Sequence, residues 1–168
     1  DSLQDELTGA VREMDHALVK FHGMYEQDDR DLREERAAQK LDKLYSFMIR
    51  LRIPGGLITP EQWIMAHHVA GNYTTGVIKI TTRQTIQLHG ILKRHIKPTL
   101  QDFNTVGLDS IAACGDVNRN VIASSHPSIS PLHAHIHSYA KKISEALLPK
   151  TRAFYEVWLD EEPLNDKK

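Results

Sequence analysis

Several side chains that can bind anions are concentrated in short stretches of a chain whose net charge is almost zero. They lie within residues 50–52, 79–90 and 115–120, and they are Arg50, Arg52, Lys79, Arg83, Gln87, His89, Asn118 and Arg119. Arginine pairs with carboxylates and oxyanions through its planar guanidinium group and stays charged at any working pH. Several such cations around one cavity would repel each other, and a polyanionic ligand would relieve that repulsion. The set therefore indicates an anion site, although any one cation alone is more typical of a solvent-exposed sheet face.

Alternating side chains predict strands that would place these residues on one face of a sheet. In residues 47–53, apolar side chains alternate with Met48, Arg50 and Arg52, and the sequence Pro-Gly-Gly at 54–56 ends the strand. Two more strands are predicted at 76–82 and 84–90. Because successive side chains of a strand point to opposite faces, one face is polar and the other apolar. The expected polar face carries Lys79, Thr81, Thr85, Gln87 and His89, and the expected apolar face carries Val77, Ile78, Ile80, Ile86 and Leu88.

Helices are predicted between and after these strands. Thr59 and Gln62 have the spacing of a capping box, Pro60 occupies the first helical position, and Gly71-Asn72 ends the helix. A second helix is predicted at 97–106. The order strand, helix, strand, strand, helix indicates an α+β fold with helices on one face of a sheet. The polar face is then left for a ligand or a partner.

Segments on either side of this unit carry weaker signals. The densely charged residues 28–40 predict a solvated helix with spaced opposite charges. A further helix is predicted at 132–148, followed by a strand at 153–160 with no visible partner nearby. We expect a further domain to begin near residue 119.

Composition excludes several classes of protein. The 168 residues contain 21 Lys and Arg against 22 Asp and Glu, so the formal charge of -1 provides no general attraction to nucleic acid or membrane. Cys114 is the only cysteine, which excludes an internal disulfide and any multi-thiolate metal site built by this chain alone. No long apolar run or signal peptide is seen, and we expect a globular cytoplasmic protein.

Four separate stretches resemble one known family in both letters and order. They are FHGMYEQDDRD at 21–31, FMIRLRIPGG at 47–56, TTRQTIQLHGI at 81–91 and DVNRN at 116–120. They are similar to the amino-terminal half of the assimilatory sulfite reductase hemoproteins, with ferredoxin-dependent nitrite reductases as more distant relatives. The resemblance runs from about Phe21 to Asp160.

The resemblance implies an oxidoreductase of sulfur assimilation that reduces sulfite to sulfide. It would take electrons from an NADPH-dependent flavoprotein or from ferredoxin and pass them through a [4Fe-4S] cluster to siroheme. By residue matching, Arg50 and Arg119 would bind the substrate anion. The residues matched to siroheme binding are Lys79, Thr81, Arg83, Thr85, Gln87, His89, Asn118 and Asn120. Asn118 and Asn120 flank Arg119 and could fix its loop.

The chain also departs from the family pattern. The cluster-ligating cysteines and the substrate-binding lysines of the family lie in a carboxy-terminal region that this chain lacks, and Cys114 lies in the wrong motif to replace a ligand. We therefore expect an amino-terminal piece, or one part of a split enzyme, that is inactive alone and needs the remaining carboxy-terminal half. The expected division is an arm at 1–45, a ferredoxin-like half domain (βαββα) at 46–118, and the incomplete start of an α/β siroheme and cluster domain at 119–168.

Other interpretations use the same residues. A nitrite reductase would keep the family and change the substrate, whereas a non-enzymatic RNA-binding module could share the βαββα order and the basic sheet face. His133 and His137 have the spacing of a metal pair on a helix, but nothing nearby completes a site, so we expect a surface helix and no metal. His67 and His68 are expected to be partly buried packing residues.

Overall fold

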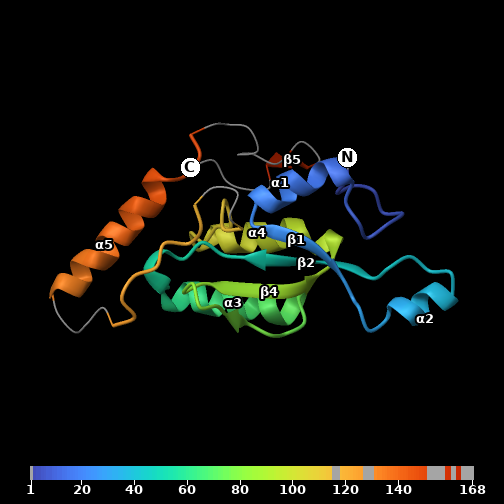
Figure 1. The fold of residues 1–168 in the computed structure, drawn as a ribbon, viewed down its shortest axis with the longest axis horizontal. Helices are drawn as coiled ribbons and strands as arrows, with labels where there is room; N and C mark the ends of the chain where they lie inside the picture. Colours follow the sequence, from blue (N-terminus) through green and yellow to red (C-terminus); the bar gives the residue numbers. More distant parts are fainter. Residues whose placement is uncertain (1, 115–117, 127–130, 151–157, 160–161, 164–168) are drawn as a thin grey trace.

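A computed structural model describes residues 2–114, 118–126, 131–150, 158–159 and 162–163. The helices are α1 (His16–Phe21), α2 (Arg33–Ala38), α3 (Pro60–Tyr73), α4 (Ile96–Thr105) and α5 (Pro131–Ala146), with 3-10 turns η1 (Glu13–Asp15), η2 (Pro54–Gly56) and η3 (Lys93–His95). The strands are β1 (Met24–Asp28), β2 (Tyr45–Arg50), β3 (Lys79–Ile80), β4 (Ile86–Ile91), β5 (Trp158–Leu159) and β6 (Glu162–Pro163). Figure 1 shows α3 and α4 beside the central strands and α5 at one end of the molecule.

The central sheet has four antiparallel strands in the order β1-β2-β4-β3. From β2 to α4 the elements follow the order strand, helix, strand, strand, helix, so this prediction is confirmed. The first strand, β1, was not predicted, and it comes from residues that the sequence analysis assigned to an amino-terminal arm. The strand expected at 153–160 lies mostly outside the described residues, and Trp158–Leu159 pairs with β6.

The hydrophobic core lies between the sheet and the two helices α3 and α4. Phe47 and Ile49 on β2 and Leu88 on β4 are fully buried against Val69 of α3 and Phe103 of α4. The apolar positions predicted for 47–53 therefore face the core. Their alternation puts Arg50 on the opposite face.

The start of α3 has the predicted capping box. The Thr59 hydroxyl oxygen accepts from the Gln62 backbone N–H at 3.2 Å, and the Gln62 side-chain oxygen accepts from the Thr59 N–H at 3.0 Å. Two otherwise unpaired N–H groups of the helix start are thus satisfied. The Gln62 amide also donates to the Val106 carbonyl at 3.1 Å and ties α3 to the end of α4.

The strand predicted at 76–82 is wrong in length, because β3 comprises only Lys79–Ile80. It is an edge strand, and Ile80 and Val77 are 75% and 52% exposed instead of facing the core. The chain turns directly after it, with the Thr81 N–H donating to the Thr85 carbonyl at 2.9 Å. The residues after Ile80 form this turn, so they do not extend β3.

Helix α5 packs against the turn η2. Gly55 has φ +67°, and a Cβ at this position would lie 2.7 Å from His137 Nδ1, so both conformation and space require glycine. The Gly55 N–H donates to the Val121 carbonyl at 2.8 Å, which adds the loop after residue 117 to the same junction. The predictions of helices at 97–106 and 132–148 agree with α4 and α5 within two residues at each end.

Candidate anion-binding site

Three polar residues lie side by side across the middle of the sheet. Arg50 on β2 is the register partner of Gln87 on β4, and Gln87 is the partner of Lys79 on β3. In the amide orientation that satisfies both groups, the Gln87 oxygen accepts from Nε and Nη2 of Arg50 at 2.8 and 2.6 Å. Arg50 Nη1 donates to the Ala113 carbonyl at 3.4 Å. These acceptors are neutral, so within the described part of the chain the charge of Arg50 has no carboxylate partner.

Arg52, which the sequence analysis placed on the same cationic face, has a different environment. Its Nε and Nη2 donate to the two oxygens of Asp109 at 2.9 and 2.6 Å, and Nη1 donates to the Ser144 hydroxyl at 3.0 Å. The side chains of Arg52 and Asp109 are only 10% and 11% exposed. The guanidinium is neutralised in place and links the sheet to α5, so Arg52 does not belong to the candidate site.

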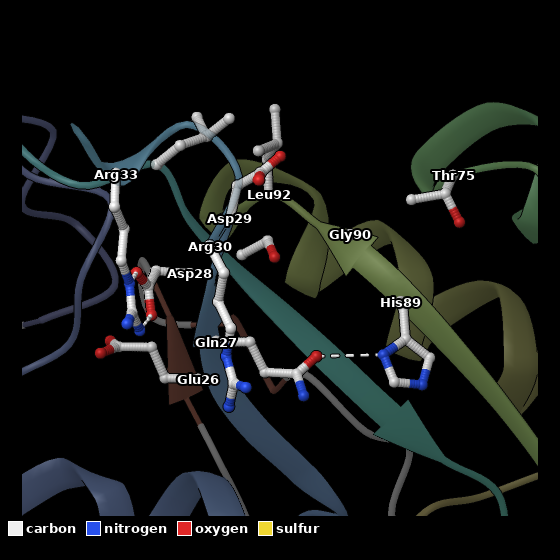
Figure 2. Close-up of a pocket in the computed structure, with 12 residues that line it drawn as sticks. Glu26, Gln27, Asp28, Asp29, Arg30, Arg33, Thr75, His89, Gly90 and Leu92 are labelled. Carbon is white, nitrogen blue, oxygen red and sulfur yellow. Dashed lines mark hydrogen bonds and ion pairs between the residues drawn. The ribbon is translucent and has the colours of Figure 1, made fainter. Parts of the chain in front are cut away.

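His89 lies next to this row and faces a pocket of about 640 Å³. Its Nδ1 is 3.0 Å from the side-chain oxygen of Gln27 on β1, as Figure 2 shows. Burial, followed by the nearby charges of Lys79 and Arg50, lowers the pKa of His89 below its ordinary value. Its Nε2 is buried and has no hydrogen-bond partner among the described residues. Gln27 was missed as a site residue, although it lies in a stretch that carries the family resemblance.

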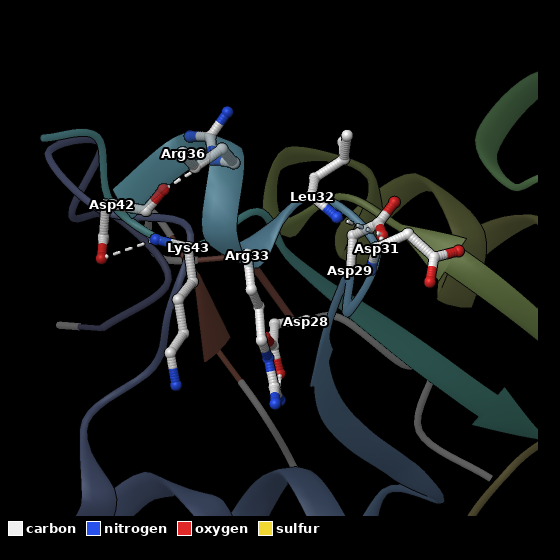
Figure 3. Close-up of polar contacts among 8 residues, drawn as sticks. All are labelled: Asp28, Asp29, Asp31, Leu32, Arg33, Arg36, Asp42 and Lys43. Atoms are coloured by element: carbon white, nitrogen blue, oxygen red, sulfur yellow. Dashed lines mark hydrogen bonds and ion pairs between the residues drawn. The ribbon is translucent and has the colours of Figure 1, made fainter. Parts of the chain in front are cut away.

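In the wall of this pocket that β1 and α2 form, charged side chains pair with groups in the same wall. Arg33 donates to both carboxylate oxygens of Asp28, and this hydrogen bonding is the main cause that lowers the pKa of Asp28. Arg36 donates to the Asp42 backbone carbonyl at 2.6 Å, as Figure 3 shows. Of the solvated helix predicted at 28–40, the structure has only the short α2 (Arg33–Ala38), and Asp28 belongs to β1. Arg33 and Arg36 of this helix therefore stabilise the local structure through these hydrogen bonds.

The structure brings the stretches 79–90 and 118–120 together through Asn120. The Asn120 side chain is 2% exposed; its oxygen accepts from the Ile53 N–H at 2.8 Å, and its nitrogen donates to the carbonyls of Ile53 and Arg83 at 2.8 and 2.9 Å. Arg83 Nη1 in turn lies 3.5 Å from the Asn120 carbonyl. The Asn120 amide is therefore used to hold backbone.

The other predicted site residues are spread over different surroundings. Thr85 is buried, and its hydroxyl donates to the Leu51 carbonyl, so it does not lie on an open polar face as expected. Thr81 and Thr85 line a separate hollow of about 300 Å³ with Trp63 and His137. The Asn118 side chain donates to the Arg119 carbonyl at 3.2 Å.

The cations of the site differ in exposure. Lys79, Arg83 and Arg119 are exposed, whereas Arg50 is half-buried. Within the described residues, no direct contact joins Arg50 to Arg119.

The histidine pairs do not form a metal site in the part of the chain that the structure describes. No group of three potential ligands occurs there, and the buried ring of His137 hydrogen-bonds through Nε2 to the Ser124 carbonyl at 2.8 Å. His67 and His68 are exposed, so their expected packing role is wrong. His68 Nε2 lies 3.7 Å from a carboxylate oxygen of Asp102 on α4, and its ring meets the ring of Tyr73 edge-on.

Among the described helices, none has the length and apolar character needed to cross a bilayer.

Comparisons with known proteins agree with this fold. Residues 39–106 match the family model of the nitrite/sulfite reductase ferredoxin-like half domain. Residues 39–106 therefore form a ferredoxin-like half domain of the nitrite/sulfite reductase family, and the predicted fold class is confirmed.

Within this family, the relatives with high identity are sulfite reductase subunits. Over 168 residues the chain is 65% identical to the sulfite reductase (NADPH) hemoprotein beta-component of Leptospira biflexa, and over 164 residues it is 55% identical to that of Staphylococcus haemolyticus. These matches cover 100% and 98% of the chain but only 30% and 29% of the relatives. The fold also resembles that of Mycobacterium tuberculosis NirA protein, with a TM-score of 0.66 at 21% identity over 83% of this chain and 27% of NirA. The matches favour the reductase hypothesis over the RNA-binding one.

Proposed function

We propose that this chain is part of a sulfite reductase that uses siroheme and a [4Fe-4S] cluster, and that it supplies contacts to siroheme carboxylates and to the substrate anion. The observation that carries the proposal is the row Arg50, Gln87 and Lys79, in which Arg50 is ordered by neutral acceptors alone. The names of the relatives support sulfite as the substrate. The chain spans about 30% of their length, so the activity belongs to the complete protein.

The donor set fits an iron macrocycle rich in carboxylates. Within the described residues, Arg50, Lys79 and Arg83 form no ion pair with a carboxylate, in contrast to Arg33 and Arg52. The buried His89 Nε2 adds an unsatisfied polar atom at the same face. Carboxylate groups would balance these charges, and one of them would accept a hydrogen bond from His89 Nε2 when that nitrogen carries a proton.

Each residue has a role in the proposal. Arg50 and Arg119 bind sulfite and stabilise negative charge as its oxygens leave as water. Lys79, Thr81, Arg83, Gln87 and His89 hold siroheme, while Thr85, Asn118 and Asn120 hold the backbone that carries these contacts. When bound, siroheme and the cluster supply the electron chemistry, and this chain supplies placement and charge.

The rest of the protein completes the site. One cysteine in 168 residues cannot provide a cluster with four thiolates, so these ligands come from elsewhere in the complete protein. The electron donor is an NADPH-dependent flavoprotein or ferredoxin, and the reaction serves sulfur assimilation in the cytoplasm. In this proposal residues 46–118 form the half domain, preceded by the segment 1–45 and followed by the beginning of the siroheme domain at 119–168.

The test uses the complete protein, with siroheme measured by absorbance and turnover measured with sulfite and with nitrite. Arg83→Ala should lower siroheme content several-fold. Arg119→Ala should keep siroheme and lower sulfite turnover on the order of a hundredfold, the loss typical of removing a preorganised donor. Arg12→Ala is the matched control, because Arg12 is also an exposed arginine and lies at the start of η1, outside the sheet.

Three results would contradict the proposal. Wild-type siroheme content in Arg83→Ala would remove its cofactor role, and wild-type turnover in Arg119→Ala would remove its substrate role. If the complete protein reduced nitrite but not sulfite, the proposed substrate would be wrong and nitrite would take its place.

A further inference from the structure

A hydrogen bond joins two strands of the sheet that are not neighbours. Gln27 is on β1 and His89 is on β4, with β2 between them, and the two residues are 62 positions apart in the sequence. The Gln27 side-chain oxygen lies 3.0 Å from His89 Nδ1, and Figure 2 shows the two groups facing each other across the sheet. Gln27 is exposed and is the register partner of Ser46 through its backbone.

This contact selects one form of the imidazole ring. An amide oxygen can only accept a hydrogen bond, so His89 Nδ1 must carry a proton. In the neutral ring the lone pair then lies on Nε2, which is buried and without a partner in the described part of the chain. Any proton that His89 gains or loses is therefore exchanged at Nε2.

Burial and the nearby cations favour the neutral ring. Burial is the main cause that lowers the pKa of His89, and the charges of Lys79 on β3 and Arg50 on β2 add to it. The pocket that His89 lines also contains Glu26, Asp28, Asp29, Arg30 and Arg33 from β1, the turn after it and α2. Because the folded ring binds its proton less readily than the unfolded one, its contribution to stability is present at neutral pH and is lost as the pH falls below the ordinary value.

We propose that Gln27 is a positioning residue that fixes His89 as the Nδ1–H form, so that Nε2 is the atom that meets a carboxylate of the bound macrocycle. The proposal rests on the proposed function for the identity of that ligand. A carboxylate at Nε2 requires the ring to take up a proton there, because only Nε2–H can donate to it. Binding of siroheme is then linked to proton uptake by His89, and it weakens as the pH rises.

The first arm of the test needs no cofactor. The complete protein, labelled with 15N-histidine and purified without siroheme, is examined by long-range 1H–15N correlation spectra, and His89→Asn assigns the signals. Wild type should show a protonated Nδ1 and an unprotonated Nε2 above the His89 pKa. Gln27→Met, which is similar in shape but cannot accept, should show a mixture of both neutral forms.

Two further variants separate positioning from general disturbance. Gln27→Glu keeps an acceptor and adds a negative charge, so it should retain the Nδ1–H form and raise the His89 pKa. Gln101→Met is the matched control, because Gln101 is an exposed residue of α4. An unchanged tautomer and titration midpoint in Gln27→Met would overturn the proposal.

The second arm measures siroheme retention against pH in the holoenzyme. Wild type and Gln27→Glu should lose siroheme as the pH rises, with the midpoint higher in Gln27→Glu, and Gln27→Met should show a weaker dependence. Identical profiles in wild type and Gln27→Met would overturn the link to the ligand. A complete protein that binds no siroheme would overturn the proposed function, whereas the tautomer measurement would still decide whether Gln27 fixes His89.

Discussion

Arg50 ends β2 and Arg52 lies two residues further along the chain, yet their surroundings are opposite. Arg52 donates to both oxygens of Asp109 and to Ser144, and it is almost fully buried. Arg50 is half-buried and donates to the amide oxygen of Gln87 and to the Ala113 carbonyl. Two arginines can therefore differ in role because of their hydrogen-bond partners. An arginine paired with a carboxylate has a structural role, whereas one held by neutral oxygens can still bind an anionic ligand.

The two arginines differ in how strongly they attract an anion. The carboxylate of Asp109 cancels the charge of Arg52, so this pair has little attraction left for an incoming anion. Neutral acceptors hold the Arg50 guanidinium in place without cancelling its charge, so most of its attraction for an anion remains. Lys79, two strands away on the same row, increases the positive potential there.

The largest expected effect on folding comes from breaking the Arg52 region. Arg52→Met should reduce the free energy of unfolding of the complete protein by about 3–5 kcal/mol, because it leaves the Asp109 carboxylate buried without its partner. Urea unfolding measures the loss, with Arg12→Met as an exposed control. A loss below about 1 kcal/mol would show that the Asp109 carboxylate does not depend on Arg52 for its stability in the fold.

A smaller effect should follow from making the Arg50 region resemble the Arg52 region. Gln87→Glu would give Arg50 a carboxylate partner, so the free energy of unfolding should change by no more than about 1 kcal/mol, as for a partly exposed pair. Siroheme content should nevertheless fall, because the new charge opposes the carboxylates of the ligand. Unchanged siroheme content in Gln87→Glu would argue against an anion at this row.

Much of the fold could be predicted because its signals are local. The capping box at Thr59 and Gln62 and the apolar alternation at Phe47 and Ile49 each lie within a few residues. β1 was missed because its sequence, MYEQD, has only one clearly apolar residue to mark a face. β3 was predicted too long because the apolar residues around it alternate as in a buried strand, although β3 is an exposed edge strand. The periodicity of a sequence does not show whether a strand lies at the edge of its sheet.

The candidate site could be predicted only as a set of residue types. Asp109 neutralises Arg52 and so excludes it from the candidate site, and Asp109 is 57 positions away in the sequence. Asn120 was expected to contact siroheme, but its amide holds the backbone of Ile53, which lies 67 positions away. Such assignments depend on contacts between distant segments, and local sequence carries no signal for them.

If the uncompensated charge of Arg50 serves the substrate anion, sulfite should bind less tightly when this charge is removed. In the complete protein, sulfite binding is followed by the siroheme absorbance of Arg50→Met and Arg52→Met. Arg50→Met should bind sulfite tenfold to hundredfold more weakly than wild type, about the value of a charged hydrogen bond, with siroheme content retained. Folded Arg52→Met should keep near wild-type affinity. Equal affinity in Arg50→Met and wild type would show that Arg50 does not bind the substrate anion.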